Sequence, residues 1–304
     1  MIAELRNAFS RPEPPQQRTE MGFFTDTTLC IGCKACEVAC KQWNQLPADG
    51  FHWTGNSYDN TISLSDTTWR HVAFVEQFDG GGADRAGRWL MMSDVCKHCV
   101  QAPCQEACPT GAIIYNEFGN VYVQQDICNG CGYCVAACPF GVIARNESDG
   151  HAHKCTLCYD RQKDGVEPAC AKACPTDSIQ FGPIGELREK ARRRVEELHE
   201  RGMGEAYLYG AEPSGEYSAL NAFFLLTDRP TVYNLPEAPR RPVAITNTKN
   251  TAMKRRTKNG AAPKHGMLSG FPDSVRDILY SFHNWRQVKS DRQHSRRKRQ
   301  NQRQ

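Results

Sequence analysis

The sequence predicts an α+β fold, rich in loops, in which one structural unit is repeated with a pseudo-twofold relation. The first reason is the placement of its sixteen cysteines, which all lie between positions 30 and 174 in four groups of four. The second is that three of these groups end alike, as CPTGAI at 108–113, CPFGVI at 138–143 and CPTDSI at 174–179. The third is an amphipathic helical segment, residues 182–202, directly after the last group.

Both ends of the chain are polar. Residues 1–20 are rich in Pro, Gln and Arg and have no apolar export core, so they predict a disordered lead-in. Residues 240–304 hold 17 Lys and Arg against 3 Asp, a charge of +14, and since the whole chain carries +4 the first 239 residues carry −10. Within this basic tail a linker precedes residues 272–289, whose apolar positions predict an amphipathic helix.

Residues 41–95 read as an insertion between the first two cysteine groups. TWRHVAFVEQF at 68–78 and GRWLMMS at 87–93 flank a Gly-rich segment, which predicts a β-hairpin. We therefore expect one domain over 21–182 that contains this hairpin insertion.

The segment after the cysteines predicts a helix that begins at Gly182 and Pro183 and stops at Gly202. Its apolar residues at helical spacing form one face, namely Leu187, Ala191, Val195 and Leu198. Residues 183–239 are expected to pack on the main domain as this helix followed by an extended segment.

Every cysteine group opens C-x2-C and closes C-x3-C. The third group, CNGCGYCVAACP, matches the C-x2-C-x2-C-x3-C-P run of bacterial ferredoxins, in which three thiolates bind one 4Fe-4S cluster and the fourth binds another. The first group differs only in having Lys41 where the proline would be, and the second and fourth have a longer middle gap. The sequence therefore predicts tandem ferredoxin-like 4Fe-4S domains.

Each closing segment predicts a short helix that carries the last two cysteines and is stopped by Pro109, Pro139 or Pro175. A cysteine one turn along a helix is too far away to bind the same cube, so it binds the neighbouring one. Pairing the second group with the third and the first with the fourth gives four 4Fe-4S ligand sets: Cys30, Cys33, Cys36 and Cys174 (cluster 1); Cys40, Cys155, Cys158 and Cys170 (cluster 2); Cys96, Cys99, Cys104 and Cys138 (cluster 3); and Cys108, Cys128, Cys131 and Cys134 (cluster 4).

Structural zinc is the alternative for such paired motifs, but it does not explain the repeated Cys-Pro ends or the C-x2-C-x2-C triplets.

Gly32 and Gly130 occupy equivalent places, where the missing Cβ lets backbone amides approach a ligand. We expect His98 to be an ordinary side chain, because four thiols are already present. Five lysines either raise the reduction potential of the clusters or are solvated loop residues: Lys34, Lys41, Lys97, Lys154 and Lys172.

The sequence contains no GxGxxG motif, no phosphate-binding loop and no catalytic dyad. A chain of clusters without these features conducts electrons between partners and has no catalytic residues of its own. The predicted role is therefore that of a non-catalytic subunit.

Four segments resemble the iron–sulfur beta subunit of formate dehydrogenases: GFFTDTTLCIGCKACEVACKQWN at 22–44, SDVCKHC at 93–99, ICNGCGYCVAACPFGVI at 127–143 and KCTLCYDRQKDGVEPACAKACPTDSIQFG at 154–182. The resemblance covers residues 21–235. It implies a molybdenum or tungsten pterin alpha subunit that oxidises formate, a relay through four 4Fe-4S clusters, and the ligand sets given above. The alternative is the iron–sulfur subunit of another molybdopterin oxidoreductase, acting on dimethyl sulfoxide, polysulfide, thiosulfate or nitrite.

Membrane-bound members of that family end in a transmembrane helix, whereas this chain has no 18-residue apolar run and carries the basic tail instead. We expect the electron acceptor to be quinone-linked or soluble, and no nucleic acid to bind. The 272–289 segment is expected to contact anionic lipid or a partner subunit, with a solvated tail as the alternative. The expected location is the cytoplasm or the periphery of the cytoplasmic membrane, and export to the periplasm with a partner is the open alternative.

Overall fold

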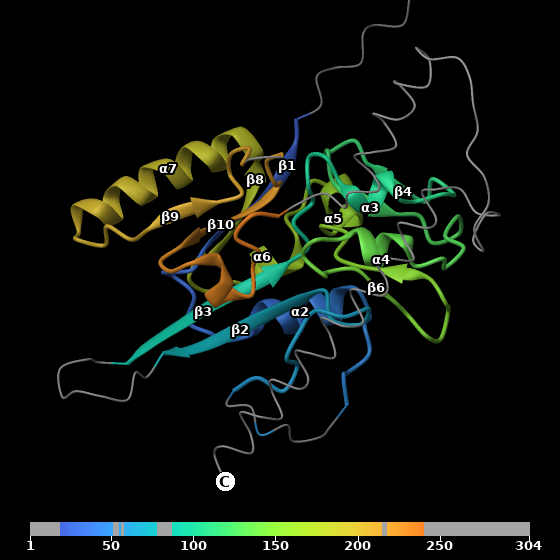
Figure 1. Ribbon diagram of the computed structural model, residues 1–304, viewed down its shortest axis with the longest axis horizontal. Coiled ribbons are helices and arrows are strands. Elements are labelled where there is room, and N and C mark those ends of the chain that lie inside the picture. The colour runs from blue at the N-terminus through green and yellow to red at the C-terminus, as the bar shows by residue number, and fades with distance from the viewer. Residues whose placement is uncertain (1–18, 51–54, 56–57, 78–86, 215–217, 240–304) are drawn as a thin grey trace, which may run out of the picture.

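The computed structural model describes residues 19–50, 55, 58–77, 87–214 and 218–239 (Figure 1). Residues 1–18 of the predicted lead-in and the whole basic tail, including the helix predicted at 272–289, lie outside the described residues. The largest sheet has four strands in the order β8 (Ile179–Pro183), β1 (Met21–Asp26), β10 (Ala222–Leu226) and β9 (Tyr207–Tyr209). Strand β1 pairs antiparallel with β8 but parallel with β10.

Strand β1 separates two hydrophobic clusters. Successive side chains of a strand point to opposite faces, and Phe23 and Phe24 are both fully buried but belong to different clusters. Phe23 packs among cysteine-bearing segments, whereas Phe24 stacks on Phe223 with 5.4 Å between ring centroids, in the cluster that contains helix α7 (Ile184–Glu200). The central strand thus joins the cysteine region to the C-terminal helix.

Helix α7 confirms the helix predicted from residues 182–202. It follows Pro183, ends just before Gly202, and buries Leu187, Ala191 and Leu198 against the sheet. In Figure 1 it runs along the sheet, on the side of the molecule away from α3 and α4.

The hairpin predicted in the insertion is also confirmed. Strands β2 (Arg70–Gln77) and β3 (Arg88–Val95) pair antiparallel over eight residues, from Arg70 opposite Val95 to Gln77 opposite Arg88. In Figure 1 the hairpin extends as a long arm from the body of the molecule. Its base lies next to the first two cysteines of the second group, since Val95 directly precedes Cys96.

The cysteine-bearing helices pack in the pairs that the pseudo-twofold repeat predicts. Helix α2 (Ala35–Trp43) of the first group contacts α6 (Ala169–Lys172) of the fourth, and α3 (Pro103–Glu106) of the second contacts α4 (Tyr133–Ala137) of the third. Each Cys-Pro end leads toward a strand, as predicted: β4 (Ile113–Tyr115), β6 (Ala144–Arg145) and β8. Strand β4 pairs with β5 (Val121–Val123) and β6 with β7 (Ala152–His153). Two short helices complete the described residues, α5 (Tyr159–Lys163) and a 3-10 turn at Pro230–Tyr233.

The prediction that each short helix carries both closing cysteines is wrong for three groups. Helices α3, α4 and α6 end before Cys108, Cys138 and Cys174. Each of these cysteines precedes a proline, whose ring disfavours helical geometry in the preceding residue, and Cys138 is extended with ψ of 113°. Only α2 carries both of its closing cysteines, because Lys41 stands in place of the proline and the helix continues to Trp43.

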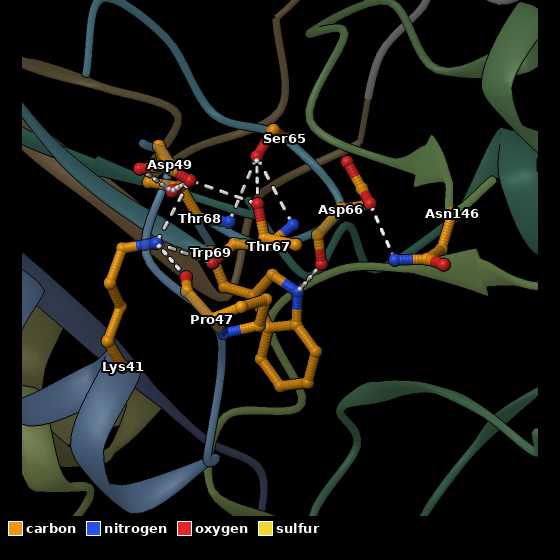
Figure 2. Close-up of polar contacts among 9 residues, drawn as sticks. All are labelled: Lys41, Pro47, Asp49, Ser65, Asp66, Thr67, Thr68, Trp69 and Asn146. Atoms are coloured by element: carbon orange, nitrogen blue, oxygen red, sulfur yellow. Dashed lines mark hydrogen bonds and ion pairs between the residues drawn. The ribbon is translucent and has the colours of Figure 1, made fainter. Parts of the chain in front are cut away.

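The extended end of α2 is fixed to the insertion by a set of polar contacts (Figure 2). The ammonium of Lys41 donates to the carbonyl oxygens of Pro47 (3.0 Å) and Thr67 (2.9 Å) and to the Asp49 carboxylate (3.1 Å). Asp49 also accepts from the hydroxyls of Thr67 at 3.0 Å and Thr68 at 2.6 Å. Further along, the Asp66 carboxylate accepts from the Asn146 amide at 2.7 Å, which ties the insertion to the residue after β6. We call the contacts around Lys41 and Asp49 the α2 clamp.

Candidate metal centres

Three cavities in the structure are each lined by four cysteines. These sets are Cys30, Cys33, Cys36 and Cys174; Cys96, Cys99, Cys104 and Cys138; and Cys108, Cys128, Cys131 and Cys134. Each cavity combines three cysteines from one group with one from a different group. The groupings are those that the sequence predicts for clusters 1, 3 and 4.

The remaining four cysteines also lie close together. Cys40 is buried, and its pKa is raised well above the usual range by burial and then by the nearby thiols of Cys155, Cys170 and Cys158. These are the four residues predicted for cluster 2. The structure therefore brings every predicted set of four thiols into one place.

Burial favours the protonated form of the more deeply buried of these thiols. Desolvation raises the pKa of Cys36, Cys134 and Cys155 to about 12 and that of Cys158 to about 11, with neighbouring thiols adding to the effect. A thiolate is the form that binds iron, and a coordinating thiol is deprotonated outright by the metal. Such sites are therefore suited to a strongly positive iron–sulfide core.

The four sets form a row. Cys170 of set 2 lies close enough to Cys36 of set 1 to contribute to the raised pKa of Cys36, and Cys96 of set 3 contributes in the same way to the raised pKa of Cys155 in set 2. Sets 3 and 4 are joined by α4 and the residue that follows it, because Cys134 in α4 belongs to set 4 and Cys138 belongs to set 3. Cys33 in set 1 and Cys131 in set 4 are exposed, whereas the other fourteen cysteines are buried or half-buried. The row therefore reaches the surface at both of its ends.

The five lysines near the cysteine groups are in two different environments. The side chain of Lys97 is fully buried, with Asp94 and the Val95 carbonyl as acceptors, and Lys154 donates to the Val121 and Cys155 carbonyls. Both line the cavity of set 3. The other three lie nearer the surface: Lys34 and Lys41 pair with Asp59 and Asp49, and Lys172 is 71% exposed. Only Lys97 and Lys154 have the buried position that a strong influence on a cluster requires.

Two other buried groups stand out. Arg70, which sequence reasoning missed, is 1% exposed and lies among cysteines of sets 1 and 2. His98 is fully buried, and neither of its ring nitrogens has a hydrogen-bond partner in the structure. Burial, followed by the charges of Lys154 and Arg70, lowers the pKa of His98 well below its usual range, so the ring is neutral. No local pattern distinguishes Arg70, which is the first residue of an otherwise ordinary strand.

The glycines at equivalent places in the first and third groups have a steric role. Gly32 and Gly130 adopt φ of 68° and 70°, in the left-handed region. A Cβ at Gly130 would lie 2.2 Å from the carbonyl oxygen of Gly150, and one at Gly32 would lie 2.6 Å from the Phe74 ring. These contacts explain both glycines through the packing of their loops.

The thiol sets fit a cluster better than a single ion. Across the described residues, which include all sixteen cysteines, no group of three or more His, Cys, Asp or Glu side chains could hold one metal ion. Four thiolates around a zinc ion must converge to about 2.3 Å from one point. Four thiolates around a cube bind four different irons and stand further apart, so the residues present fit 4Fe-4S clusters.

Comparison with known proteins identifies two 4Fe-4S dicluster domains, matching residues 29–112 and 87–184. Two dicluster domains carry four 4Fe-4S clusters. The nitrate-inducible formate dehydrogenase iron–sulfur subunit of Escherichia coli is 40% identical over 243 residues, covering 77% of this chain and 80% of that protein. The formate dehydrogenase iron–sulfur subunit of Haemophilus influenzae is 39% identical over 239 residues, covering 77% and 74%.

A sister enzyme matches over a shorter stretch. The B subunit of the anaerobic dimethyl sulfoxide reductase of Escherichia coli is 38% identical over 172 residues, which is 57% of this chain and 78% of that protein. Within the part of the sequence that the structure describes, none of the helices has the length and apolar character needed to cross a bilayer. The longer match, together with four sets of four thiols, shows that this protein belongs to the family of formate dehydrogenase iron–sulfur subunits and is a non-catalytic electron-transfer subunit with four 4Fe-4S clusters.

Proposed function

We propose that the chain receives electrons from a molybdenum or tungsten pterin subunit that oxidises formate, and passes them to a quinone-linked or soluble acceptor. Oxidation of formate to carbon dioxide releases two electrons and one proton, and 4Fe-4S clusters supply one-electron steps. The residues of this chain hold the clusters at fixed spacing, exclude water and set the potentials. The row of four thiol sets, exposed at both ends, is the observation that carries the proposal.

The proposed ligands are the four predicted sets. Support comes from the cavities for sets 1, 3 and 4 and from the proximity of the four thiols in set 2. Electrons would then travel along the order 1, 2, 3, 4, in one direction or the other, because each set has its successor as a neighbour. One end of this row would face the catalytic subunit and the other the acceptor.

The location and the basic tail are also part of the proposal. We place the complex in the cytoplasm or at the periphery of the cytoplasmic membrane, with export beside a partner as the alternative outcome. Residues 272–289 would contact anionic lipid or a partner subunit, which the +14 charge of residues 240–304 supports. Binding of the purified complex to vesicles with and without anionic lipid distinguishes these two partners.

The first experiment tests the substrate and the cofactor together. The complex is purified anaerobically from its own host, assayed for formate-driven dye reduction, and analysed for iron, sulfide, molybdenum and tungsten. Formate activity with about sixteen irons per chain, four for each of four cubanes, is the expected result. Sixteen irons without formate activity would indicate that the chain serves another molybdopterin oxidoreductase with a different substrate. Zinc in place of iron would contradict the electron-transfer role.

The second experiment tests the crossing of ligands between groups by counting iron in double variants. If Cys138 and Cys99 hold the same cluster, Cys138→Ser combined with Cys99→Ser loses one cubane and leaves about twelve irons. Cys138→Ser combined with Cys131→Ser then loses two cubanes and leaves about eight. The opposite pattern would mean that Cys138 binds with its own group, and the proposed ligand sets would be wrong.

A further inference from the structure

Arg70 occupies an unusual place for an arginine. It begins β2 at the base of the hairpin, opposite Val95 in the strand pairing, and is 1% exposed. One guanidinium nitrogen, Nη1, donates to the Ser93 hydroxyl at 3.0 Å and to the Ser93 carbonyl oxygen at 3.4 Å, and the hydroxyl lies 3.3 Å from the Cys36 sulfur. The guanidinium carbon lies over the Phe23 ring, 4.8 Å from its centre. The position of the group is therefore fixed by the hydroxyl and carbonyl of Ser93 and by the ring of Phe23.

The charge of Arg70 has no partner carboxylate among the described residues. None of their ion pairs includes Arg70, and its buried Nε and Nη2 groups have no hydrogen-bond acceptor there. A buried, unpaired charge costs several kcal/mol. A guanidinium cannot relieve this cost by losing its proton, because it stays protonated in proteins. Such a group persists where an anion lies beside it.

The neighbours of Arg70 come from two different ligand sets. Burial lowers the pKa of Arg70, but the nearby sulfurs of Cys170, Cys36, Cys155 and Cys40 outweigh this effect and raise the pKa. Cys36 belongs to set 1 and the other three belong to set 2. Arg70 therefore stands between the places of two adjacent clusters, with two N–H donor groups unused.

We propose that Arg70 is a shared positioning residue for clusters 1 and 2, which donates hydrogen bonds from Nε and Nη2 to their sulfurs and raises both reduction potentials. A cluster with four thiolates is net negative, and reduction adds one more negative charge, so a fixed cation stabilises the reduced form. Because one charge serves both clusters, it lowers the energy of the electron on either of them and supports transfer between them. The inference rests on the ligand sets proposed above.

Arg70 differs in this respect from the buried lysines near cluster 3. The ammonium of Lys97 is engaged by Asp94 and a carbonyl, and that of Lys154 by two carbonyls. The aspartate offsets the charge of Lys97, and both ammonium groups have acceptors already. The guanidinium of Arg70 keeps a full charge and two donor groups for the clusters.

The test is a potentiometric titration of the whole complex, followed by EPR, for Arg70→Gln and Arg70→Lys. Arg70→Gln removes the charge, and we expect the reduction equilibrium constant of two of the four clusters to fall at least tenfold, about 59 mV for a one-electron couple. Arg70→Lys keeps the charge but not the planar fork, so we expect a smaller shift of the same two clusters. Lys172→Gln is the control, because it removes a charge that is 71% exposed and close to ligands in sequence, and it should leave all four potentials unchanged.

Sixteen irons with unmoved potentials in Arg70→Gln would overturn the role of Arg70. A wrong ligand set, by contrast, shows in the iron counts of the cysteine double variants and not in this titration. If Arg70→Gln fails to retain its iron, the role of Arg70 is tested instead on the unsubstituted complex labelled with ¹⁵N-arginine, by measuring hyperfine couplings. A hyperfine coupling between arginine nitrogen and a reduced cluster is expected there, and its absence would overturn the proposal.

Discussion

At the scale of single residues, the ion pair between Asp26 and Arg194 joins the end of the central strand to helix α7. Asp26 is fully buried, and its carboxylate accepts from Arg194 Nε at 2.9 Å and from the backbone and hydroxyl of Thr28. Arg194 also donates to the Thr28 hydroxyl at 3.3 Å. This pair lies just before Cys30, so it fixes the start of the first cysteine loop.

Replacing Arg194 by methionine should therefore be costly. Arg194→Met leaves a buried carboxylate with its charged partner removed, and we expect a loss of about 3 kcal/mol in the free energy of unfolding. The corresponding fall in melting temperature is measured by thermal denaturation under anaerobic conditions. Arg193→Met is the matched control, since Arg193 is 62% exposed and pairs with Glu189 at the surface. The control should change stability by less than about 0.5 kcal/mol, and equal effects of the two variants would contradict the role of the buried pair.

At the scale of elements, one substitution in the repeat changes the length of a helix. The sequence shows that Lys41 stands where the other groups have proline, and from this we could have expected α2 to be longer than α3, α4 and α6. The contacts that the last turn of α2 makes with other segments could not be predicted from the sequence. Lys41 binds the insertion through the α2 clamp, and the Trp43 indole donates to Asp160 at 2.8 Å while the Arg161 guanidinium lies over its ring. The missing proline thus provides two contacts with other segments.

The α2 clamp predicts a dependence on pH. Burial would raise the pKa of Asp49, but hydrogen bonds from Thr68, Lys41 and Thr67 outweigh it and lower the pKa. A carboxyl whose pKa is lower in the folded protein stabilises it above its unfolded pKa of about 3.9, and this contribution is lost as the pH falls through the folded pKa. Asp49→Asn should cost about 1 kcal/mol at pH 7, because solvent screens this partly exposed site.

The measurement is hydrogen exchange at the backbone amides of Thr67 and Thr68. At pH 7 the wild-type protein should protect these amides roughly fivefold more than Asp49→Asn, as 1 kcal/mol implies. The ratio should approach one as the pH falls below about 4. A ratio that stays constant into acid would show that the charge of Asp49 is not what holds the loop.

The sequence predicted those features that depend on short spacing. A C-x2-C turn, a C-x3-C segment and the apolar face of α7 are each contained in a few turns of chain, and all were found where the pattern put them. The short helices were predicted too long, since the effect of Pro109, Pro139 and Pro175 on the residue before each was overlooked. Arg70 could not be found from its neighbours in sequence, because its environment is made by cysteines from positions 36 to 170.

At the scale of the whole molecule, the buried residues of the described chain extend to position 235. Leu235 is 3% exposed within the core, and the Tyr209 hydroxyl donates to the carbonyl oxygen of Pro236 at 2.7 Å. Contacts with the core therefore extend to Pro236, one residue beyond the 21–235 stretch that resembles the family. A truncation that removes the basic tail therefore has to end after Pro236 if these contacts are to stay intact.

A chain ending at Pro239 should keep its four clusters. We expect about sixteen irons and a melting temperature close to that of the full chain, because no described core contact is removed. A chain ending at Asn234 is the comparison: it loses Leu235 and the acceptor for Tyr209, which should cost about 2–4 kcal/mol. Iron loss from the longer of these two chains would mean that the tail supports the cluster domain.

The parallel pairing of β1 with β10 sets a constraint on synthesis. The Thr27 hydroxyl donates to the carbonyl oxygen of Leu225, and the two residues are 198 positions apart. At a translation rate of about 5–20 residues per second, β1 waits on the order of 10–40 s for this partner. During that time the nascent chain carries Phe23 and Phe24 without the strand that later covers them, and for most of it Cys30 lacks Cys174. In the proposed set 1, cluster insertion has to wait until Cys174 has been synthesised, and β1 stays without its partner β10 until Ala222–Leu226 emerge from the ribosome.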